Sequence, residues 1–366
     1  MPAVGSRSWV RDFDWTMAAL VLAIAALGLI QVYSSTMHTA FQQAFGRHAV
    51  WLALGLVLFW LASHVDYRRV VALSTLLWVA GVAALAAILL YADPVNGSRR
   101  WLPTPFGVSV QVSEVMKAVL VLVFAQRFAT HVARPVGFRD AAVTALLFCV
   151  PFLLVANQPD LSTALSMCPV LGVPVLLSKL RKRHFAIAGL LALLLLPLGW
   201  SQLEPYQKDR IIGFLDPHDA PRGIGYQILQ SKIAVGAGGM WGQGFVQGSQ
   251  TQLRFLPTPH TDFILASFAE ERGFAGVATV LALYYFLLMR IVRIARSAAD
   301  TEGMLIAMSV AGLLLFHIVV NVGMVINKLP VTGLPLPLMS YGGSSLLVVL
   351  AMLGLVNNVR LRRFVN

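Results

Sequence analysis

Long apolar stretches alternate with short polar segments along nearly the whole chain. Stretches of about 20 apolar residues are long enough to cross the hydrocarbon core of a bilayer as helices. The pattern therefore predicts an all-α polytopic membrane protein with about ten transmembrane helices, forming a single membrane domain over residues 1–366. The predicted spans are 15–34, 48–64, 70–91, 108–128, 141–157, 161–178, 184–203, 262–290, 303–326 and 342–359.

Two of these spans leave the helix count open. The stretches 141–157 and 161–178 are short, and only a few residues around Gln158, Pro159 and Asp160 separate them. They could form two spans, one kinked hairpin or a re-entrant pair.

The positions of lysine and arginine predict the orientation of the chain in the membrane, because cytoplasmic connections carry an excess of these residues. With the N-terminus in the cytoplasm, the basic clusters at 68–69, 181–183, 290–296 and 360–363 all fall on the cytoplasmic side. Both termini are then cytoplasmic. The longest polar connection, about 204–261 between the seventh and eighth helices, is then extracytoplasmic.

This long connection contains two local signals. Residues 226–235 place Ile228, Leu229 and Ile233 at helical spacing, which predicts an amphipathic helix at the membrane surface. The glycine-rich stretch 236–244 lacks the residue order of a nucleotide-binding loop. We expect these glycines to let the connection fold tightly against the membrane surface.

Composition supports a membrane protein and argues against other classes. Hydrophobic residues make up 58% of the chain and charged residues 12%, whereas about 25% of a soluble protein is typically charged. The net charge of +12 does not predict nucleic-acid binding, because the basic residues lie in short clusters between apolar runs. Cys149 and Cys168 lie inside apolar runs, where we expect small buried residues rather than a disulfide or a metal site.

Asp262 stands where the longest polar connection meets a predicted membrane helix, in the tract His260-Thr261-Asp262-Phe263. Acidic side chains near a bilayer are costly and persist where a function or a partner stabilises them. An aspartate at a helix start can also cap free backbone amides. Two roles are open for Asp262, helix capping and catalysis, and they require opposite changes of its pKa. A cap lowers the pKa, whereas a general base needs a pKa near the operating pH.

Glu114 and Lys117 lie in the fourth predicted span at positions i and i+3, so they share one face of a helix. We expect an ion pair, because each charge alone would cost about 3 kcal/mol at the bilayer centre. Two interpretations are open: the pair stabilises the fold, or it lines a polar cavity.

Polar residues also gather at two predicted outer segments. Gln158 and Asp160 flank Pro159, where a capped turn is the favoured interpretation and a functional site is the alternative. Arg100 and Trp101 could anchor the chain at the membrane interface. They could equally bind a diphosphate, because a guanidinium group matches phosphate oxygens in a bidentate way.

Residues 329–345, LPVTGLPLPLMSYGGSS, carry prolines and glycines that exclude a regular helix. Non-helical backbone near membrane depth is tolerated where it lines a cavity or is buried in protein. Ser340 and Tyr341 supply hydroxyl groups in this segment. The chain lacks the H-E-x-x-H, Cys-x-x-Cys and G-x-S-x-G motifs, so the common hydrolase and metal-site templates do not apply.

Several of these tracts resemble the SEDS family of bacterial cell-wall proteins (shape, elongation, division, sporulation), and the resemblance covers nearly the whole chain. The tracts are Arg100-Trp101, Ser113 to Lys117, Gln158 to Leu165, Asp216 to Gln227, Phe255 to Phe263, Ala269 to Gly273 and Leu329 to Ser345. The amino-acid sequences of these tracts resemble the elongation branch of the family more than its division or sporulation branches. Two positions depart from the family pattern: Thr258 stands where glutamate is usual, and Asn327-Lys328 replaces a small residue.

The resemblance implies a peptidoglycan glycosyltransferase in the bacterial cytoplasmic (inner) membrane that polymerises lipid II during cell elongation. Lipid II is a disaccharide-pentapeptide carried on undecaprenyl diphosphate. The implied partners are a class B penicillin-binding protein, which is a transpeptidase, and membrane lipid, with no nucleic acid. Asp262 is carried over as the candidate catalytic residue, and our hypothesis is that it acts as the general base of an inverting transfer. A divalent cation, Mg²⁺ or Mn²⁺, is a candidate cofactor to which no ligands are assigned.

Candidate substrate-binding residues come from the polar tracts and from the arginines of the long connection, which could stabilise a leaving diphosphate. They are Arg100, Trp101, Glu114, Lys117, Gln158, Asp160, Arg210, Thr261, Ser340 and Tyr341.

Two other functions stay open at this point. An intramembrane charge pair and broken helices also suit a transporter that flips lipid II across the membrane. The polar groups argue against it, because they cluster at the predicted outer face rather than at the midplane. The second alternative is a non-catalytic scaffold that positions the penicillin-binding protein.

Overall fold

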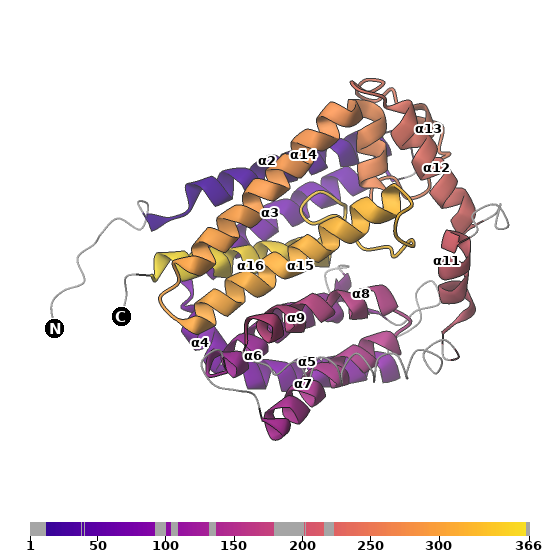
Figure 1. Cartoon of the computed structure of the whole chain (residues 1–366). Helices are drawn as coiled ribbons and strands as arrows, with labels where there is room; N and C mark the ends of the chain where they lie inside the picture. Colours follow the sequence, from indigo (N-terminus) through magenta and orange to yellow (C-terminus); the bar gives the residue numbers. More distant parts are fainter. Residues whose placement is uncertain are drawn as a thin grey trace.

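The structure is a computed structural model that describes residues 12–37, 39, 41–91, 100–103, 109–131, 137–178, 201, 203–215 and 223–363. Helices dominate these residues (Figure 1). Seven of the described helices are long and apolar enough to cross a membrane, which confirms the all-α polytopic class. They are α2 (Trp15–Thr36), α3 (Gln43–His64), α5 (Ser74–Tyr91), α7 (Phe138–Ala156), α14 (Ile264–Arg296), α15 (Thr301–Val325) and α16 (Gly343–Leu361).

The remaining predicted spans have different outcomes. The fourth is α6 (Val112–Ala129), which has membrane length but carries charged residues inside it. The sixth is divided at Met167 into α8 (Leu161–Ser166) and α9 (Cys168–Leu177). The seventh, 184–203, lies almost entirely outside the described residues, so the count of ten helices stays a prediction.

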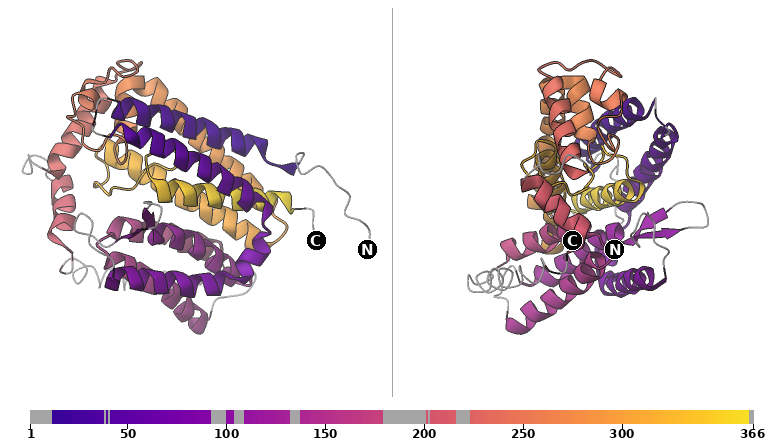
Figure 2. Two further views of the ribbon diagram at one scale, coloured as in Figure 1. Left: turned by 180° about the vertical axis from the view of Figure 1, so that it is seen from behind. Right: turned by 90° about the vertical axis from the view of Figure 1, so that its right-hand side faces the viewer.

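The helices form two groups that pack against each other (Figures 1 and 2). One group contains α2, α3, α14, α15 and α16, and the other contains α5 to α9. Helix α15 joins the groups, because it packs against α14 and α16 on one side and against α6 and α9 on the other. Accordingly α6 and α15 bury side chains around much of their circumference, which explains why they can carry polar residues.

A network of charged residues closes one end of the bundle. Asp14 is fully buried, caps α2 by accepting a hydrogen bond from the Met17 amide at 2.9 Å, and pairs with Arg290 at 2.8 Å. Arg360 also donates to the Asp14 carboxylate. The start of α2 and the ends of α14 and α16 therefore meet here. Arg290 and Arg360 belong to two of the basic clusters that the sequence predicts to be cytoplasmic, so this end carries both of those clusters.

The long connection between the seventh and eighth predicted spans contains helices of its own. They are α11 (Pro205–Leu215), α12 (Ile224–Ala237) and α13 (Ser249–Gln252). Figure 1 shows α11 along the side of the molecule, between the two helix groups. Helix α12 confirms the helix predicted at 226–235, and it packs against α14 and α15.

Helix α14 breaks near its start, at Gly273, whose φ of 64° and ψ of −168° are non-helical. The glycine-rich stretch 236–244 packs at this break and pairs with the backbone groups that the break leaves free. The bonds are Gln243 N to Glu270 O (2.9 Å), Gly244 N to Glu271 O (3.1 Å), Phe274 N to Gly239 O (2.9 Å) and Ala275 N to Met240 O (3.1 Å). The glycines therefore do permit tight folding, but against α14.

In α12, Ile228 is buried, whereas Leu229 and Ile233 are 47% and 41% exposed at the protein surface; the predicted placement of this helix at the membrane surface stays a prediction. One local expectation from the sequence is wrong: Cys149 and Cys168, expected to be buried, are exposed on the surfaces of α7 and α9. A helix that faces lipid needs no polar surface, so an apolar run does not reveal which of its residues are buried.

Candidate functional site

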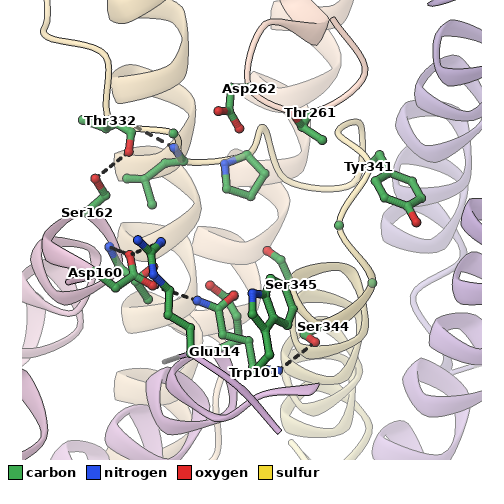
Figure 3. Close-up of a pocket in the computed structure, with 18 of the residues that line it drawn as sticks. Trp101, Glu114, Asp160, Ser162, Thr261, Asp262, Thr332, Tyr341, Ser344 and Ser345 are labelled. Carbon is green, nitrogen blue, oxygen red and sulfur yellow. Dashed lines mark hydrogen bonds and ion pairs between the residues drawn. The ribbon is translucent and has the colours of Figure 1, made fainter. Parts of the chain in front are cut away.

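A cavity of about 1190 Å³ opens at the end of the bundle that is opposite the Asp14 network. Gly343, at the start of α16, lines it, whereas Arg360, which contacts Asp14, lies near the other end of the same helix. Seventeen residues of helix separate the two, roughly 25 Å at 1.5 Å per residue. The cavity walls come from α3, α6, α8 and α11, the turn before α14, the segment between α15 and α16, the start of α16 and the residues Arg100, Trp101 and Gln111. Figure 3 shows part of this lining.

Asp262 lies in a turn just before α14. The helix begins at Ile264, its N-cap is Phe263, and no described side chain caps it, so the geometry does not support the capping interpretation. The carboxyl group faces the cavity (Figure 3). A Cβ atom placed on Gly333 would lie 3.5 Å from Asp262 Oδ2 and 3.8 Å from Arg210 Nη2. Asp262 and Arg210 therefore converge beside Gly333, where any larger side chain would contact both.

The surroundings of Asp262 act on its acidity in opposite directions. Burial raises the pKa of the Asp262 carboxyl above its ordinary value. The positive charge of Arg210 and a hydrogen bond with Thr261 lower that pKa, and burial is the larger effect. Burial also lowers the pKa of the neighbouring His260. A raised carboxyl pKa is the property that a general base at neutral pH requires.

The turn that carries Asp262 is fixed by hydrogen bonds to two other parts of the chain. Ser340 Oγ donates to Thr261 O at 2.7 Å, and the Tyr341 amide donates to His260 O at 2.9 Å. Asn321 of α15 donates to Asp262 O at 3.0 Å. Consecutive carbonyls of the turn are thus each bound from outside it, which limits movement of the Asp262 backbone.

Arg210 reaches the cavity from α11. Its Nη1 donates to Thr332 O at 2.8 Å, and the same carbonyl accepts a hydrogen bond from Ser162 Oγ at 2.5 Å. Thr332 belongs to the non-helical segment that the sequence predicts from its prolines and glycines. This segment therefore serves as a wall that connects α11, α8 and Asp262.

Arg100 and Asp160 form part of another wall. Asp160 caps α8 through the Thr163 amide at 3.3 Å, which confirms the capped turn predicted there. Asp160 also accepts from Gln111 Nε2 at 2.8 Å and pairs with Arg100 Nη1 at 3.6 Å. A short hairpin of β1 (Trp101–Pro103) and β2 (Ser109–Gln111), which the sequence does not predict, places Trp101 opposite Gln111.

The predicted ion pair in α6 is present. Lys117 Nζ lies 2.8 Å from Glu114 Oε1, and the side chains are 2% and 5% exposed. Glu114 lines the cavity, whereas Lys117 does not. The pair therefore stabilises two buried charges and presents its acidic member to the cavity, so both interpretations of the pair apply.

The cavity brings together many of the residues predicted from the sequence. They are Asp262, Arg100, Trp101, Glu114, Asp160, Arg210, Thr261 and Tyr341. Lys117, Gln158 and Ser340 lie behind the wall instead. Gln158 is buried and donates to Leu85 O at 2.9 Å, and Ser340 binds backbone groups of two loops.

Sequence reasoning missed other residues at the cavity. Arg47 and Trp51 line it from α3, whose first turns precede the predicted span. Asn321 contacts the Asp262 backbone from α15. An asparagine in an otherwise apolar span is a signal that could have identified Asn321, because polar groups at membrane depth tend to be functional.

The predicted divalent cation has no evident ligand set in the part of the chain that the structure describes. There, no three His, Cys, Asp or Glu side chains come together in a way that could hold a metal ion. The carboxyl groups of Asp262, Glu114 and Asp160 belong to separate walls of the cavity. We therefore assign no step of the chemistry below to a metal.

The fold and the cavity define the class of the protein: a multi-pass membrane protein with a polar cavity at one end of its helical bundle. Residues 14–363 match the family described as "Cell cycle protein", which comprises FtsW, RodA and SpoVE. The chain belongs to this family, the SEDS family.

Named relatives and solved structures are similar over nearly the full length. The chain is 36% identical over 354 residues to peptidoglycan glycosyltransferase MrdB of Escherichia coli K12, covering 96% of this chain and 94% of the relative. It is 32% identical over 432 residues to peptidoglycan glycosyltransferase RodA of Treponema pallidum, covering 97% and 99%.

Among solved structures, the rod shape determining protein RodA of Thermus thermophilus superposes with a TM-score of 0.72 at 32% identity, covering 97% of this chain and 98% of that one. A chain from a study of polymerization and crosslinking by a peptidoglycan synthase complex has a TM-score of 0.82 at 35% identity, covering 97% and 99%.

Proposed function

We propose that this protein is a peptidoglycan glycosyltransferase that polymerises lipid II during cell elongation, with Asp262 as the general base. Membership of the SEDS family and the names of its relatives support the reaction class. The observation that supports the role of Asp262 is its placement: a carboxyl group with a raised pKa that faces a large cavity beside an arginine.

The proposal includes the orientation predicted from the sequence: ten helices in one domain, both termini cytoplasmic and the cavity extracytoplasmic. The separation of charge along the bundle supports it. The basic clusters around Arg290 and Arg360 lie at the end opposite Asp262. A cavity at the outer membrane surface suits a substrate whose sugars are outside while its lipid tail stays in the bilayer.

In the proposed reaction, Asp262 accepts the proton of the C4 hydroxyl of the acceptor N-acetylglucosamine. That oxygen forms a bond to C1 of the donor N-acetylmuramic acid, and the bond from C1 to the diphosphate oxygen breaks. The electron pair leaves with undecaprenyl diphosphate, and the configuration at C1 inverts. General-base assistance of this kind contributes about 10²- to 10⁴-fold to a rate.

The leaving diphosphate requires positive charge, and the cavity supplies it through arginine. Arg210 and Arg100 line the cavity, and neighbouring groups restrict both guanidiniums: Thr332 O binds the first, and Asp160 and Pro159 O bind the second. Pre-oriented donors stabilise developing charge without reorganising during the reaction. Lys117 is a weaker candidate, because it is buried against Glu114 behind the cavity wall.

The proposed partner is a class B penicillin-binding protein, which would cross-link the glycan strands. The similarity to a chain from a study of a peptidoglycan synthase complex supports this pairing.

Polymerisation of lipid II by the purified protein with its partner tests the proposal, with a transpeptidase inhibitor present so that only glycan formation is scored. We expect Asp262→Asn to lose at least 10²-fold in rate, because the amide cannot accept the proton. Asp209→Asn is the matched control, since Asp209 is exposed on α11 and does not line the cavity. Normal polymerisation by Asp262→Asn would refute the general-base role.

The same materials separate the two alternative functions. Movement of lipid II across proteoliposome membranes without polymer formation would support a transporter. Normal cell-wall synthesis by a strain that carries Asp262→Asn would support a scaffold. The position of the cavity at one end of the bundle, rather than at its midplane, favours the enzyme.

A further inference from the structure

Asn321 is a fully buried amide in the most enclosed region of α15. Its Nδ2 donates to two backbone carbonyls, Asp262 O at 3.0 Å and Leu334 O at 2.9 Å. Asp262 and Leu334 belong to different loops that are distant in sequence. One side-chain nitrogen therefore joins the turn that carries the candidate base to the wall segment that faces it.

The direction of this amide is fixed by chemistry. Both partners are carbonyl oxygens, which only accept hydrogen bonds, so the nitrogen and not the oxygen of the Asn321 amide must face them. The Oδ1 atom is buried and has no hydrogen-bond partner among the described residues. Burying an unpaired polar atom costs about 1–3 kcal/mol. An apolar residue at position 321 would avoid this cost. Asparagine therefore lowers the stability of the fold unless the two hydrogen bonds that it donates offset the buried oxygen.

The second hydrogen bond reaches the wall beside the Asp262 carboxyl. Leu334 follows Gly333, and Gly333 is the residue over which the Asp262 carboxyl and the Arg210 guanidinium converge. Arg210 is itself bound to Thr332 O, one residue earlier. Within the wall segment 332–334, Thr332 O therefore accepts a hydrogen bond from Arg210, and Leu334 O accepts one from Asn321. The same Asn321 nitrogen also donates to Asp262 O.

We propose that Asn321 is a positioning residue for Asp262, which fixes the separation of its carboxyl group from Arg210 by holding the two loops on one amide nitrogen. The proposal rests on the proposed glycosyltransferase function. Asn321 does not line the cavity and touches no reacting atom; it acts through the backbone of Asp262.

The distance between Asp262 and Arg210 matters because the arginine charge lowers the pKa of the carboxyl while burial raises it. If the two loops separate, the opposing effect of Arg210 weakens and the pKa of Asp262 rises further. The acid limb of the pH–rate profile, which reports deprotonation of the base, then moves to higher pH. The other titratable groups at the cavity or beside Asp262 are Arg47, Arg100, Glu114, Asp160, Tyr341 and His260.

The experiment compares Asn321→Leu with the wild type in lipid II polymerisation with the partner protein, across a range of pH. Leucine has a similar size and donates no hydrogen bond. We expect kcat per folded molecule to fall about 10- to 100-fold, because small displacements of a reacting group can cost 10²-fold. We expect KM to change less and the acid limb to move to higher pH.

Ser309→Ala is the matched control on the same helix. Ser309 is fully buried, and its hydroxyl has no hydrogen-bond partner within the described ranges, so its removal takes away a buried polar group without disturbing the two loops. We expect normal kcat and an unchanged acid limb. Asn321→Thr provides a second variant if Asn321→Leu does not fold or has no measurable turnover. A threonine hydroxyl has one proton to donate and can hold only one of the two carbonyls.

A double variant tests whether Asn321 acts through Arg210. If it does, Asn321→Leu/Arg210→Gln has the same acid limb as Arg210→Gln alone, because the charge that the positioning controls is already absent. Independent shifts that add would overturn the proposal.

The outcomes distinguish a failure of this proposal from a failure of the proposed function. If the wild type makes no polymer, the proposed function fails and this proposal fails with it. If the wild type polymerises lipid II while the Asn321 variants lose only thermal stability, with normal kcat per folded molecule and an unchanged acid limb, the proposed function stands. Asn321 is then a structural residue.

Discussion

Replacement of Gly273 by alanine tests whether the break in α14 is built into the backbone. The residue has a φ of 64° and a ψ of −168°, a region that residues with a side chain occupy only at a cost. A Cβ atom there would lie 2.6 Å from Met240 O and still closer to the Gly242 amide nitrogen. Both are backbone atoms of the glycine-rich stretch, so no flexible side chain can move aside.

The expected cost follows from these two effects. The unfavourable dihedral angles cost about 1–3 kcal/mol. Relief of the overlap requires the glycine-rich stretch to move away, which weakens the backbone hydrogen bonds between that stretch and α14, each with a net value of about 1 kcal/mol. Loss of two of them brings the total to roughly 3–5 kcal/mol. This is at the upper end of the range for single substitutions.

The measurement is equilibrium unfolding in mixed detergent micelles, monitored by tryptophan fluorescence. Gly236→Ala is the matched control, because Gly236 lies in α12 with an ordinary φ, and a Cβ atom there would have no described neighbour within 4 Å. We expect the control to stay within about 1 kcal/mol of the wild type, since alanine favours helix. Equal stability of the two variants would refute the reasoning, and the break would then be a response to packing elsewhere.

Three further predictions concern buried charges. Arg210→Gln should raise the pKa of Asp262, since the positive charge that favours the carboxylate is removed; the acid limb of polymerisation should move to higher pH, and an unchanged limb contradicts the contact. Asp14→Ala should lower the free energy of unfolding by roughly 2–3 kcal/mol. Breaking a fully buried ion pair costs about 3–5 kcal/mol, and the cost is smaller here because Arg290 and Arg360 are partly exposed. Glu114→Gln should destabilise the protein by roughly 3–5 kcal/mol, because it leaves the buried Lys117 without its ionic partner. Glu114→Gln/Lys117→Met should recover most of this loss. If the double variant is as unstable as the single one, the ion pair does not contribute to stability as argued.

The candidate site depends on segments that meet only in the folded protein. The candidate base, Asp262, comes from the turn before α14, and the neighbouring Arg210 comes from α11. The groups that bind the Asp262 turn come from α15 and from the segment after it. Hydrogen bonds from side chains to backbone carbonyls hold several of these segments together, among them the bonds of Arg210 and Ser162 to Thr332 O and of Asn321 to Asp262 O. The geometry around Asp262 therefore depends on the path of the backbone in segments that are distant in sequence.

Local rules were enough for several features of this protein. The apolar runs determine membrane-length helices, because a bilayer requires each spanning segment to satisfy its own backbone. The ion pair of Glu114 and Lys117 follows from their spacing on one helix face. The proline- and glycine-rich segment, predicted to be non-helical over 329–345, is non-helical over 329–342, whereas Gly343, Ser344 and Ser345 already belong to the first turn of α16.

Tertiary structure alone decided which polar residues share the cavity. Asp262 and Arg210 converge at Gly333, and Asn321 joins the loops that carry them, although no sequence period relates these positions. Lys117 and Ser340 carry polar groups that sequence reasoning placed in the site, yet they lie behind its wall. The hydrophobic pattern of the sequence indicates only which residues can face lipid. Contacts between distant segments depend on how helices pack and where their backbones break, and no local pattern of residues encodes that.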